Sequence, residues 1–353
     1  MQCTLDIYTD YLICSTGQTS ATGLSRLYEG GISHDQVTRF LSHSYLDSKD
    51  LWLASKPLIR SCERKRKEGD FAVLIVDDSI LEKAHTDENA MICTHFDHSQ
   101  GRYVKGLNFL SLLYQADGLS VPVAAQLIEK TEPETDSKTG KTKFKSETTK
   151  NEYLRRMLEV AHNQVQYTYL LADSWYGSAE NMNKVLGLQH HFIFALESSR
   201  TVAVNEKERQ AGRFNRLDSL SFPDQTPLRV HLRSLKEPVS VVKQVFTNKD
   251  GSRGCLYLVT SDTDLDYGQI TTIYQRRWKV EEYHKSLKQN TSLGKSPTKT
   301  TATQGNHFFA SMLAYIKLEA LKIKLSIGHF RIKAGLYQIG LKAMFNEFNH
   351  ISA

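Results

Sequence analysis

The sequence has few cysteines and few prolines, and both shortages exclude classes of protein. Its 353 residues include 5 cysteines, scattered without any Cys-x-x-Cys pair. This odd number and this spacing argue against a disulfide framework and against a cysteine-rich zinc site. Only 7 prolines and 20 glycines leave little room for long disordered stretches. We therefore expect most of the chain to fold, at a length that fits two or three domains.

Long hydrophobic runs and a secretory signal are also missing. No apolar run reaches the roughly 18 residues that a membrane-spanning helix needs. The first residues, MQCTLDIYTDYLICS, lack the positive start and the small-residue cleavage site of a signal peptide. We expect a cytoplasmic protein without a membrane partner.

Positive charge is concentrated near the end of the sequence. The formal net charge is +6, yet residues 271–353 hold 13 Lys and Arg against 4 Asp and Glu, which is +9. The remaining 270 residues therefore sum to −3. Segregated positive charge of this kind indicates a polyanionic partner such as nucleic acid. A cluster of basic residues taken alone is equally compatible with a solvated surface.

Residues 1–68 show apolar residues at helical spacing and predict a helical region. Ser33 and Gln36 have the spacing of a capping box, so a helix should begin there, just after the turn at Gly30-Gly31. Two short helices around this turn are compatible with a DNA-binding helix-turn-helix. They are equally compatible with a helical hairpin that packs on the core.

Residues 69–197 predict an α/β core with a mixed sheet, because buried strands alternate with helices. A Lys-rich loop at 133–148 and helices near 149–164 and 178–187 separate the strands. The expected strands contain the sequences FAVLIVDDS, RYVKGLNFLSLLYQ, LSVPVAAQLIEK, YTYLLADSWYG and HHFIFAL.

The second half of the chain interrupts this pattern and then resumes it. Residues 198–268 read as short strands and turns and predict a β-rich insertion. A long helix at about 269–290 resumes the core, whose second part we place at 269–325. Further helices are expected near 304–325 and 328–348, the last within a C-terminal helical segment at 326–353.

Acidic residues lie where an α/β fold places catalytic groups. Asp77 and Asp78 end one hydrophobic strand, Asp173 ends another, and Glu281 lies inside the late helix. Each acid alone is more often a turn former or a helix cap. Three carboxylates from distant segments that meet at one sheet edge would supply oxygen ligands for Mg²⁺.

The late helix aligns four polar residues on one face. At about 100° per residue, with Tyr274 at zero, Arg277 lies near −60°, Glu281 near −20° and Lys288 near −40°. This set suits a phosphodiester held beside metal ions. The alternative is a solvated helix face with pairs of residues three and four apart.

The spacing Tyr274-x2-Arg277-x3-Glu281-x6-Lys288 resembles the Y-R-E-K motif of bacterial insertion-sequence transposases of the DDE class. VDDS at 76–79 is similar to the family's first-acid motif, and LLADSWYG at 170–177 is similar to its second. The β-rich insertion lies where such transposases carry one.

This resemblance implies an RNase H-like core in which Asp77, Asp173 and Glu281 bind two Mg²⁺ ions, with Mn²⁺ as a substitute. It also implies that Tyr274, Arg277 and Lys288 contact the DNA backbone near the cleaved phosphate. Asp78 stays open as the first acid. Lys105, in the second expected strand, is a further candidate for DNA contact, although a strand lysine is more often a solvent-facing spacer.

The resemblance further implies cleavage at transposon ends and strand transfer into target DNA, by a protein that acts near the bacterial nucleoid. A homodimer on DNA is expected because two ends must be brought together. Two alternatives remain open. One is an RNase H-like endonuclease without strand transfer, and the other is a non-catalytic transposase-derived DNA-binding protein.

Overall fold

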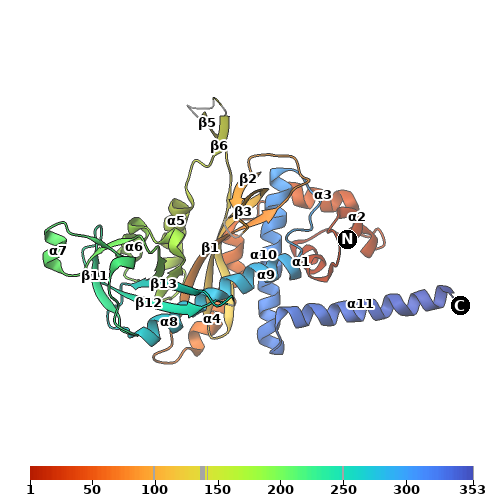
Figure 1. Ribbon diagram of the computed structural model, residues 1–353. Helices are drawn as coiled ribbons and strands as arrows, with labels where there is room; N and C mark the ends of the chain where they lie inside the picture. Colours follow the sequence, from red (N-terminus) through yellow and green to blue (C-terminus); the bar gives the residue numbers. More distant parts are fainter. Residues whose placement is uncertain (98–99, 136–139, 141, 249, 353) are drawn as a thin grey trace.

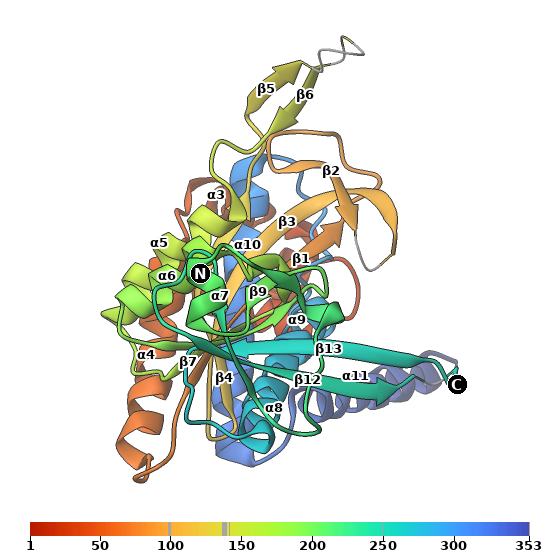
Figure 2. The same cartoon turned by 60° about the vertical axis from the view of Figure 1, so that its left-hand side comes forward.

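A large mixed β-sheet carries helices on both faces, and the N-terminal helices and α11 lie beyond one end of it (Figures 1 and 2). The computed structural model describes residues 1–97, 100–135, 140, 142–248 and 250–352. Within this part of the chain, no helix is long and apolar enough to cross a membrane.

Among the described residues, eleven strands form the large sheet in the order β10-β9-β11-β12-β13-β8-β7-β1-β3-β2, with β4 also paired to β3. Two more strands form a separate hairpin. The strands are β1 Val73–Glu82, β2 Ile92–Asp97, β3 Arg102–Ala116, β4 Leu119–Ile128, β5 Glu132–Thr135, β6 Thr142–Lys145, β7 Tyr169–Ala172, β8 His191–Leu196, β9 Thr201–Ala203, β10 Asn215–Arg216, β11 Leu228–Leu232, β12 Val239–Thr247 and β13 Arg253–Thr260.

The predicted α/β core is confirmed as a mixed sheet with flanking helices. Its central strands follow the order β4-β3-β1-β7-β8, in which β1 is antiparallel to β3 and parallel to β7. The turn between β3 and β4 falls at Asp117 and Gly118, whose φ angles of 45° and 79° are those of a tight hairpin. The ends of β1 and β7 therefore lie side by side at one edge.

Helices cover the sheet and build the N-terminal region. The α-helices are α1 Leu5–Cys14, α2 Ala21–Leu27, α3 His34–His43, α4 Ser48–Lys65, α5 Lys150–His162, α6 Ala179–Gly187, α7 Glu206–Gln210, α8 Tyr267–Gln275, α9 Lys279–Asn290, α10 Thr301–Leu325 and α11 His329–Ser352. Short 3₁₀ turns are η1 Ser174–Tyr176, η2 Leu217–Ser219 and η3 Arg276–Trp278.

The N-terminal helices α1, α2 and α3 pack against α10 and share a hydrophobic cluster with it. The capping box at Ser33 and Gln36 is present and begins α3, as its spacing predicts. Val37 and Leu41 of α3 are buried in one cluster with Ala310 and Ala314 of α10 (red and blue elements on the right of Figure 1). One face of α3 is thus used for packing, while the rest of the helix is open to solvent.

The β-rich segment extends the core sheet instead of forming a separate layer. β13 pairs antiparallel with β8, and β12, β11, β9 and β10 follow outward (left side of Figure 1). A continuous sheet means that these strands are held at a fixed angle to the core by backbone hydrogen bonds.

Three local expectations are wrong. The helix expected at 269–290 is divided into α8 and α9 by η3, where Lys279 N–H bonds back to Arg276 as in a 3₁₀ turn. The Lys-rich loop contains the β5–β6 hairpin, which the ion pair between Lys145 and Glu134 supports at 3.1 Å. Strand β2 lies between FAVLIVDDS and RYVKGLNFLSLLYQ, where we expect no strand, and its alternation of apolar and polar residues is weak.

Strand β1 separates two hydrophobic clusters because its side chains alternate between the faces of the sheet. Leu74 and Val76 lie in the cluster that includes residues of α5 and α6. Val73 and Ile75 lie in the cluster that includes residues of α8, α9 and α10. Continued alternation sends Asp77 toward α9 and Asp78 toward α5.

Candidate active site

Asp77 lies on the α9 side of β1, opposite Ser111 of β3. Its side chain is only 13% exposed, and its Oδ2 lies 3.8 Å from both Arg277 Nη1 and His284 Nδ1. Burial raises the pKa of Asp77 to about 8. Nearby Arg277 lowers it, and the carboxylates of Asp173 and Glu281 raise it further. At neutral pH this carboxyl therefore binds a proton unless another cation takes the proton's place.

Glu281 approaches Asp77 from the first turn of α9, and Arg277 lies between the two acids. The Arg277 Nη1 atom is 3.9 Å from Glu281 Oε1, and it is buried without a hydrogen-bond partner. Burial would lower the pKa of Arg277, but Tyr274 and the acids around it raise that pKa above its ordinary value. The Arg277 guanidinium thus offsets part of the negative charge of the Asp77 and Glu281 carboxylates.

Asp173 follows β7 and caps the short turn η1. Its Oδ1 accepts a hydrogen bond from the Trp175 N–H at 3.0 Å. Burial raises the pKa of Asp173, while Arg277 lowers it. Asp173 contributes to the raised pKa of Asp77 and so belongs to the same electrostatic cluster.

His284, one turn after Glu281, also faces this cluster, and sequence reasoning missed it. Only 5% of this residue is exposed, its Nε2 has no hydrogen-bond partner, and burial lowers its pKa to about 3. Among the described residues, Asp77, Glu281 and His284 form the group whose ligand atoms all lie within 4.8 Å of one another. The i, i+3 spacing from Glu281 could have revealed it, since residues three apart share a helix face.

Asp78 points to the opposite face of the sheet and is already paired. Its Oδ2 lies 2.5 Å from Lys150 Nζ at the start of α5, and its Oδ1 accepts a hydrogen bond from Tyr176 Oη at 2.7 Å. These contacts satisfy the Asp78 carboxylate without a metal ion. Of the two adjacent acids, Asp77 is the one that the structure places beside Glu281.

The other residues of the helix stripe surround the acids. The Tyr274 hydroxyl donates to the carbonyl of Ala172, next to Asp173, at 3.3 Å. Burial raises the pKa of Tyr274 to about 12, so the phenol stays a neutral donor. Lys288 Nζ donates to Ser79 Oγ at 3.0 Å, two residues beyond Asp77 on β1.

Lys105 is not brought to the acids. It lies on β3 on the same face of the sheet as Ser111, but six residues away along the strand, which is about 20 Å. Its backbone carbonyl accepts from Lys83 N–H at 2.8 Å. A DNA contact by Lys105 would therefore involve a part of the substrate remote from the acids.

Comparison with known proteins identifies the family. Residues 1–232 match the family model described as DDE superfamily endonuclease. The chain belongs to this family. The matched region contains Asp77 and Asp173 and ends before Glu281. A comparison with curated proteins gave no match.

Among solved structures, this DDE endonuclease is similar to the Drosophila P element transposase strand transfer complex. The identity is 11% and the TM-score is 0.28. The similarity covers 58% of this chain and 46% of that one, so the chain spans less than half the length of the P element protein.

Divalent metal ions are the cofactors that a DDE endonuclease implies, and the site fits one. Asp77 and Glu281 present carboxylate oxygens to one space, and burial together with the neighbouring acids raises the pKa of Asp77. Arg277 Nη1, a buried polar atom without a hydrogen-bond partner, borders this space, as does His284 Nδ1. Carboxylate oxygens are the ligands that hard cations prefer.

Proposed function

We propose that this DDE endonuclease is a transposase that cleaves DNA at transposon ends and joins the freed ends to target DNA. The observation that carries the proposal is the meeting of Asp77 from β1 with Glu281 and Arg277 from the broken late helix, beside Asp173 at the end of β7. Asp77 and Glu281 are 204 positions apart in the sequence, and Asp173 lies about midway between them. Arg277 and Glu281 have the spacing of the Y-R-E-K motif.

In this proposal, Asp77, Asp173 and Glu281 hold two Mg²⁺ ions, for which Mn²⁺ can substitute. When bound, such ions activate the attacking oxygen and stabilise the leaving oxygen of an in-line displacement. Arg277 can exchange its long contacts with the carboxylates for a phosphate once a metal neutralises them. Lys288 and Tyr274 can donate to neighbouring phosphate oxygens, as a lysine ammonium and a neutral phenol do.

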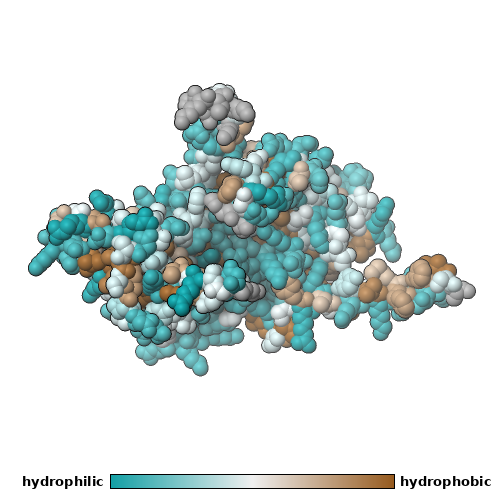
Figure 3. Space-filling view, in the orientation of Figure 1, coloured by the Kyte–Doolittle hydropathy of each residue, from teal (hydrophilic) through white to brown (hydrophobic). Residues whose placement is uncertain are grey.

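We also propose that two copies of the chain form a homodimer through α11. This helix projects from the body (Figure 1), and from Leu336 to Ser352 every residue is exposed. Figure 3 shows hydrophobic side chains along this arm. Apolar residues recur at alternating gaps of four and three, at Phe330, Ala334, Tyr337, Leu341, Met344, Phe348 and Ile351. This is the a/d repeat by which one helix packs against a like helix.

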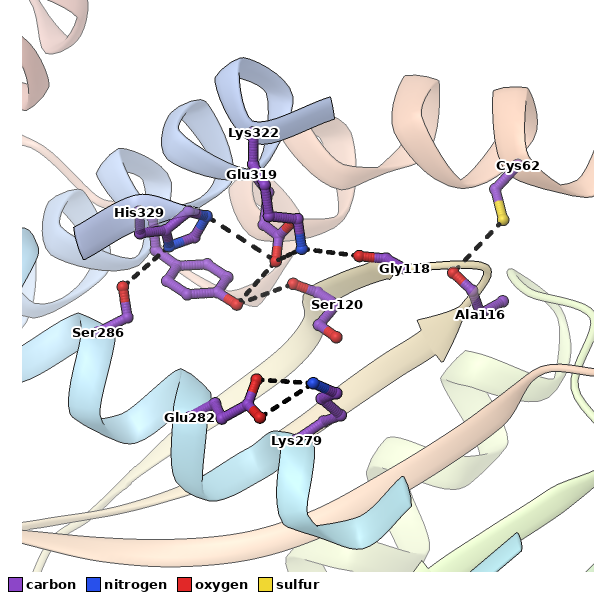
Figure 4. A network of polar contacts seen from close by, with 11 residues as sticks. Cys62, Ala116, Gly118, Ser120, Lys279, Glu282, Ser286, Glu319, Lys322 and His329 are labelled. Carbon is purple, nitrogen blue, oxygen red and sulfur yellow. Dashed lines mark hydrogen bonds and ion pairs between the residues drawn. The ribbon is translucent and has the colours of Figure 1, made fainter. Parts of the chain in front are cut away.

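A buried polar network fixes the start of α11 to the catalytic part of the protein (Figure 4). His329 Nδ1 lies 2.9 Å from Ser286 Oγ on α9, and Glu319 of α10 pairs with Lys322 at 2.6 Å and accepts from Tyr315 Oη at 3.1 Å. A dimer contact on α11 would therefore be connected to α9, the helix that carries Glu281.

The proposal is tested with labelled DNA that carries the ends of the encoding element, a supercoiled target plasmid and Mg²⁺. Wild-type protein should release 3′-hydroxyl ends and then join them to the plasmid. Cleavage without joined product would replace the transposase by an endonuclease. Binding without cleavage would replace it by a non-catalytic DNA-binding protein.

A further inference from the structure

His284 lies against the paired acids without the hydrogen bonds that a buried histidine normally makes. Its Nδ1 is 3.8 Å from Asp77 Oδ2, beyond the range of a hydrogen bond, and its Nε2 is buried without a partner. By contrast, buried His307 bonds to Tyr8 Oη and to a backbone carbonyl. Buried polar groups are rarely left unpaired in this way, so the unmade bonds call for an explanation.

The spacing of these atoms fits a shared ion. Two ligand atoms that each lie about 2.1 Å from one cation are separated by about 3.0 Å when adjacent and by about 4.2 Å when opposite. The 3.8 Å between His284 Nδ1 and Asp77 Oδ2 falls within that interval. A Glu281 carboxylate oxygen lies within 4.8 Å of this pair, so its half-exposed side chain would have to move by at most about 0.6 Å to reach the same interval.

The surroundings hold the imidazole in place. The Phe109 ring stands perpendicular to it with centroids 5.5 Å apart, and Tyr283 packs against it on α9. Phe109 belongs to β3, and α9 carries Glu281. The ring is therefore held by α9, which also carries Glu281, and by β3, which pairs with the strand that carries Asp77, as a preorganised ligand requires.

We propose that His284 is a nitrogen ligand of the ion held by Asp77 and Glu281. This inference rests on the proposed metal-dependent function of the same site. It adds His284 to the metal ligands and predicts which metal ions the site prefers. An imidazole ligand favours transition metals over Mg²⁺, which prefers oxygen. The site should therefore bind Mn²⁺ more tightly than an all-carboxylate site of the same charge.

Electron spin echo spectroscopy of the Mn²⁺-loaded wild-type protein, without DNA, tests the ligand directly. We expect nitrogen modulation from a coordinated imidazole, present in wild type and in the control His307→Gln and lost in His284→Gln. We also expect His284→Gln to weaken Mn²⁺ binding about tenfold or more, and to weaken Mg²⁺ binding less. Wild-type protein that binds Mn²⁺ without nitrogen modulation would overturn the proposal.

A second variant keeps the test decisive if the glutamine variant does not fold. His284→Cys should bind Cd²⁺ with the ultraviolet absorbance of a thiolate-metal bond, and a folded variant that binds Cd²⁺ without this absorbance would contradict the proposal. Because neither readout uses DNA, failure of the ligand assignment is separate from failure of the function. If the protein cleaves DNA but shows no nitrogen modulation, only the assignment of His284 as a ligand is rejected. If nitrogen modulation is present but DNA is not cleaved, only the transposase function is rejected.

Discussion

Replacing Asp77 by asparagine should stabilise the metal-free protein, and increasingly so as the pH rises. The pKa of Asp77 is about 8 in the folded protein, against about 3.9 for an aspartate in an unfolded chain. The folded state therefore binds more protons between these two values, and stability falls as pH rises through this window. Asparagine has no such titration.

The magnitude follows from the proton linkage. Each pH unit within the window costs about 1.4 kcal/mol, so the cost of Asp77 grows by about 3 to 4 kcal/mol between pH 5 and pH 8. Solvent screening reduces it little, because the side chain is 13% exposed. The loss of unfolding free energy caused by Asp77 is nearly absent below about pH 4 and constant above about pH 9.

Urea denaturation in the presence of a chelator, at several pH values, measures this difference. The unfolding free energy of Asp77→Asn should exceed that of wild type by an amount that increases from pH 5 to pH 8. Glu282→Gln is the matched control, because Glu282 is an exposed acid on the same helix turn, paired with Lys279. Parallel curves for wild type and Asp77→Asn would refute the buried, proton-binding carboxyl.

Three further substitutions probe the rest of the account. Lys288→Met should reduce the slope of log affinity against log salt for DNA by about 0.9, the loss of one phosphate contact, and an unchanged slope would remove Lys288 from the interface. Asp78→Asn should cost about 1 to 3 kcal/mol in urea denaturation, because Lys150 loses its partner, yet leave Mn²⁺ affinity within about twofold. Lost Mn²⁺ binding would make Asp78 the first acid. Leu341→Glu should convert a dimer into a monomer by light scattering while the control Lys342→Glu does not, and an unchanged mass would reject α11 as the dimer contact.

Much of the fold could be predicted from the sequence because its elements carry strong local signals. The run FAVLIVDDS is apolar enough to mark β1, and the Ser33 capping box marks the start of α3. The hairpin β5–β6 was missed because its β5 strand is short and exposed and buries little apolar surface. Strand β2 was missed because it is short and its polar residues leave only a weak alternation of buried and exposed positions.

The site was only partly predictable, for a different reason. The helical phase of Tyr274, Arg277, Glu281 and Lys288 could be worked out within one segment. That Asp77 faces them while Asp78 pairs with Lys150 depends on strand register, which no local pattern fixes. For His284, the sequence offers only its i, i+3 spacing from Glu281, because its proximity to Asp77 depends on how α9 packs against β1.

The acids clustered around Arg277 lower the folding stability of the metal-free protein. A buried acid with a raised pKa costs free energy in the metal-free protein and is relieved when a cation binds. Metal binding should therefore raise the unfolding free energy of the protein.

The most direct test compares Glu281→Gln with Glu282→Gln in Mg²⁺-dependent cleavage of labelled transposon-end DNA. These adjacent residues differ in direction: Glu281 faces Arg277 and the Asp77 carboxylate, while Glu282 pairs with exposed Lys279. The account predicts a loss of about 10³-fold or more in Glu281→Gln with DNA binding retained, and near wild-type cleavage in Glu282→Gln. Cleavage that survives Glu281→Gln, or that is lost equally in both variants, would contradict it.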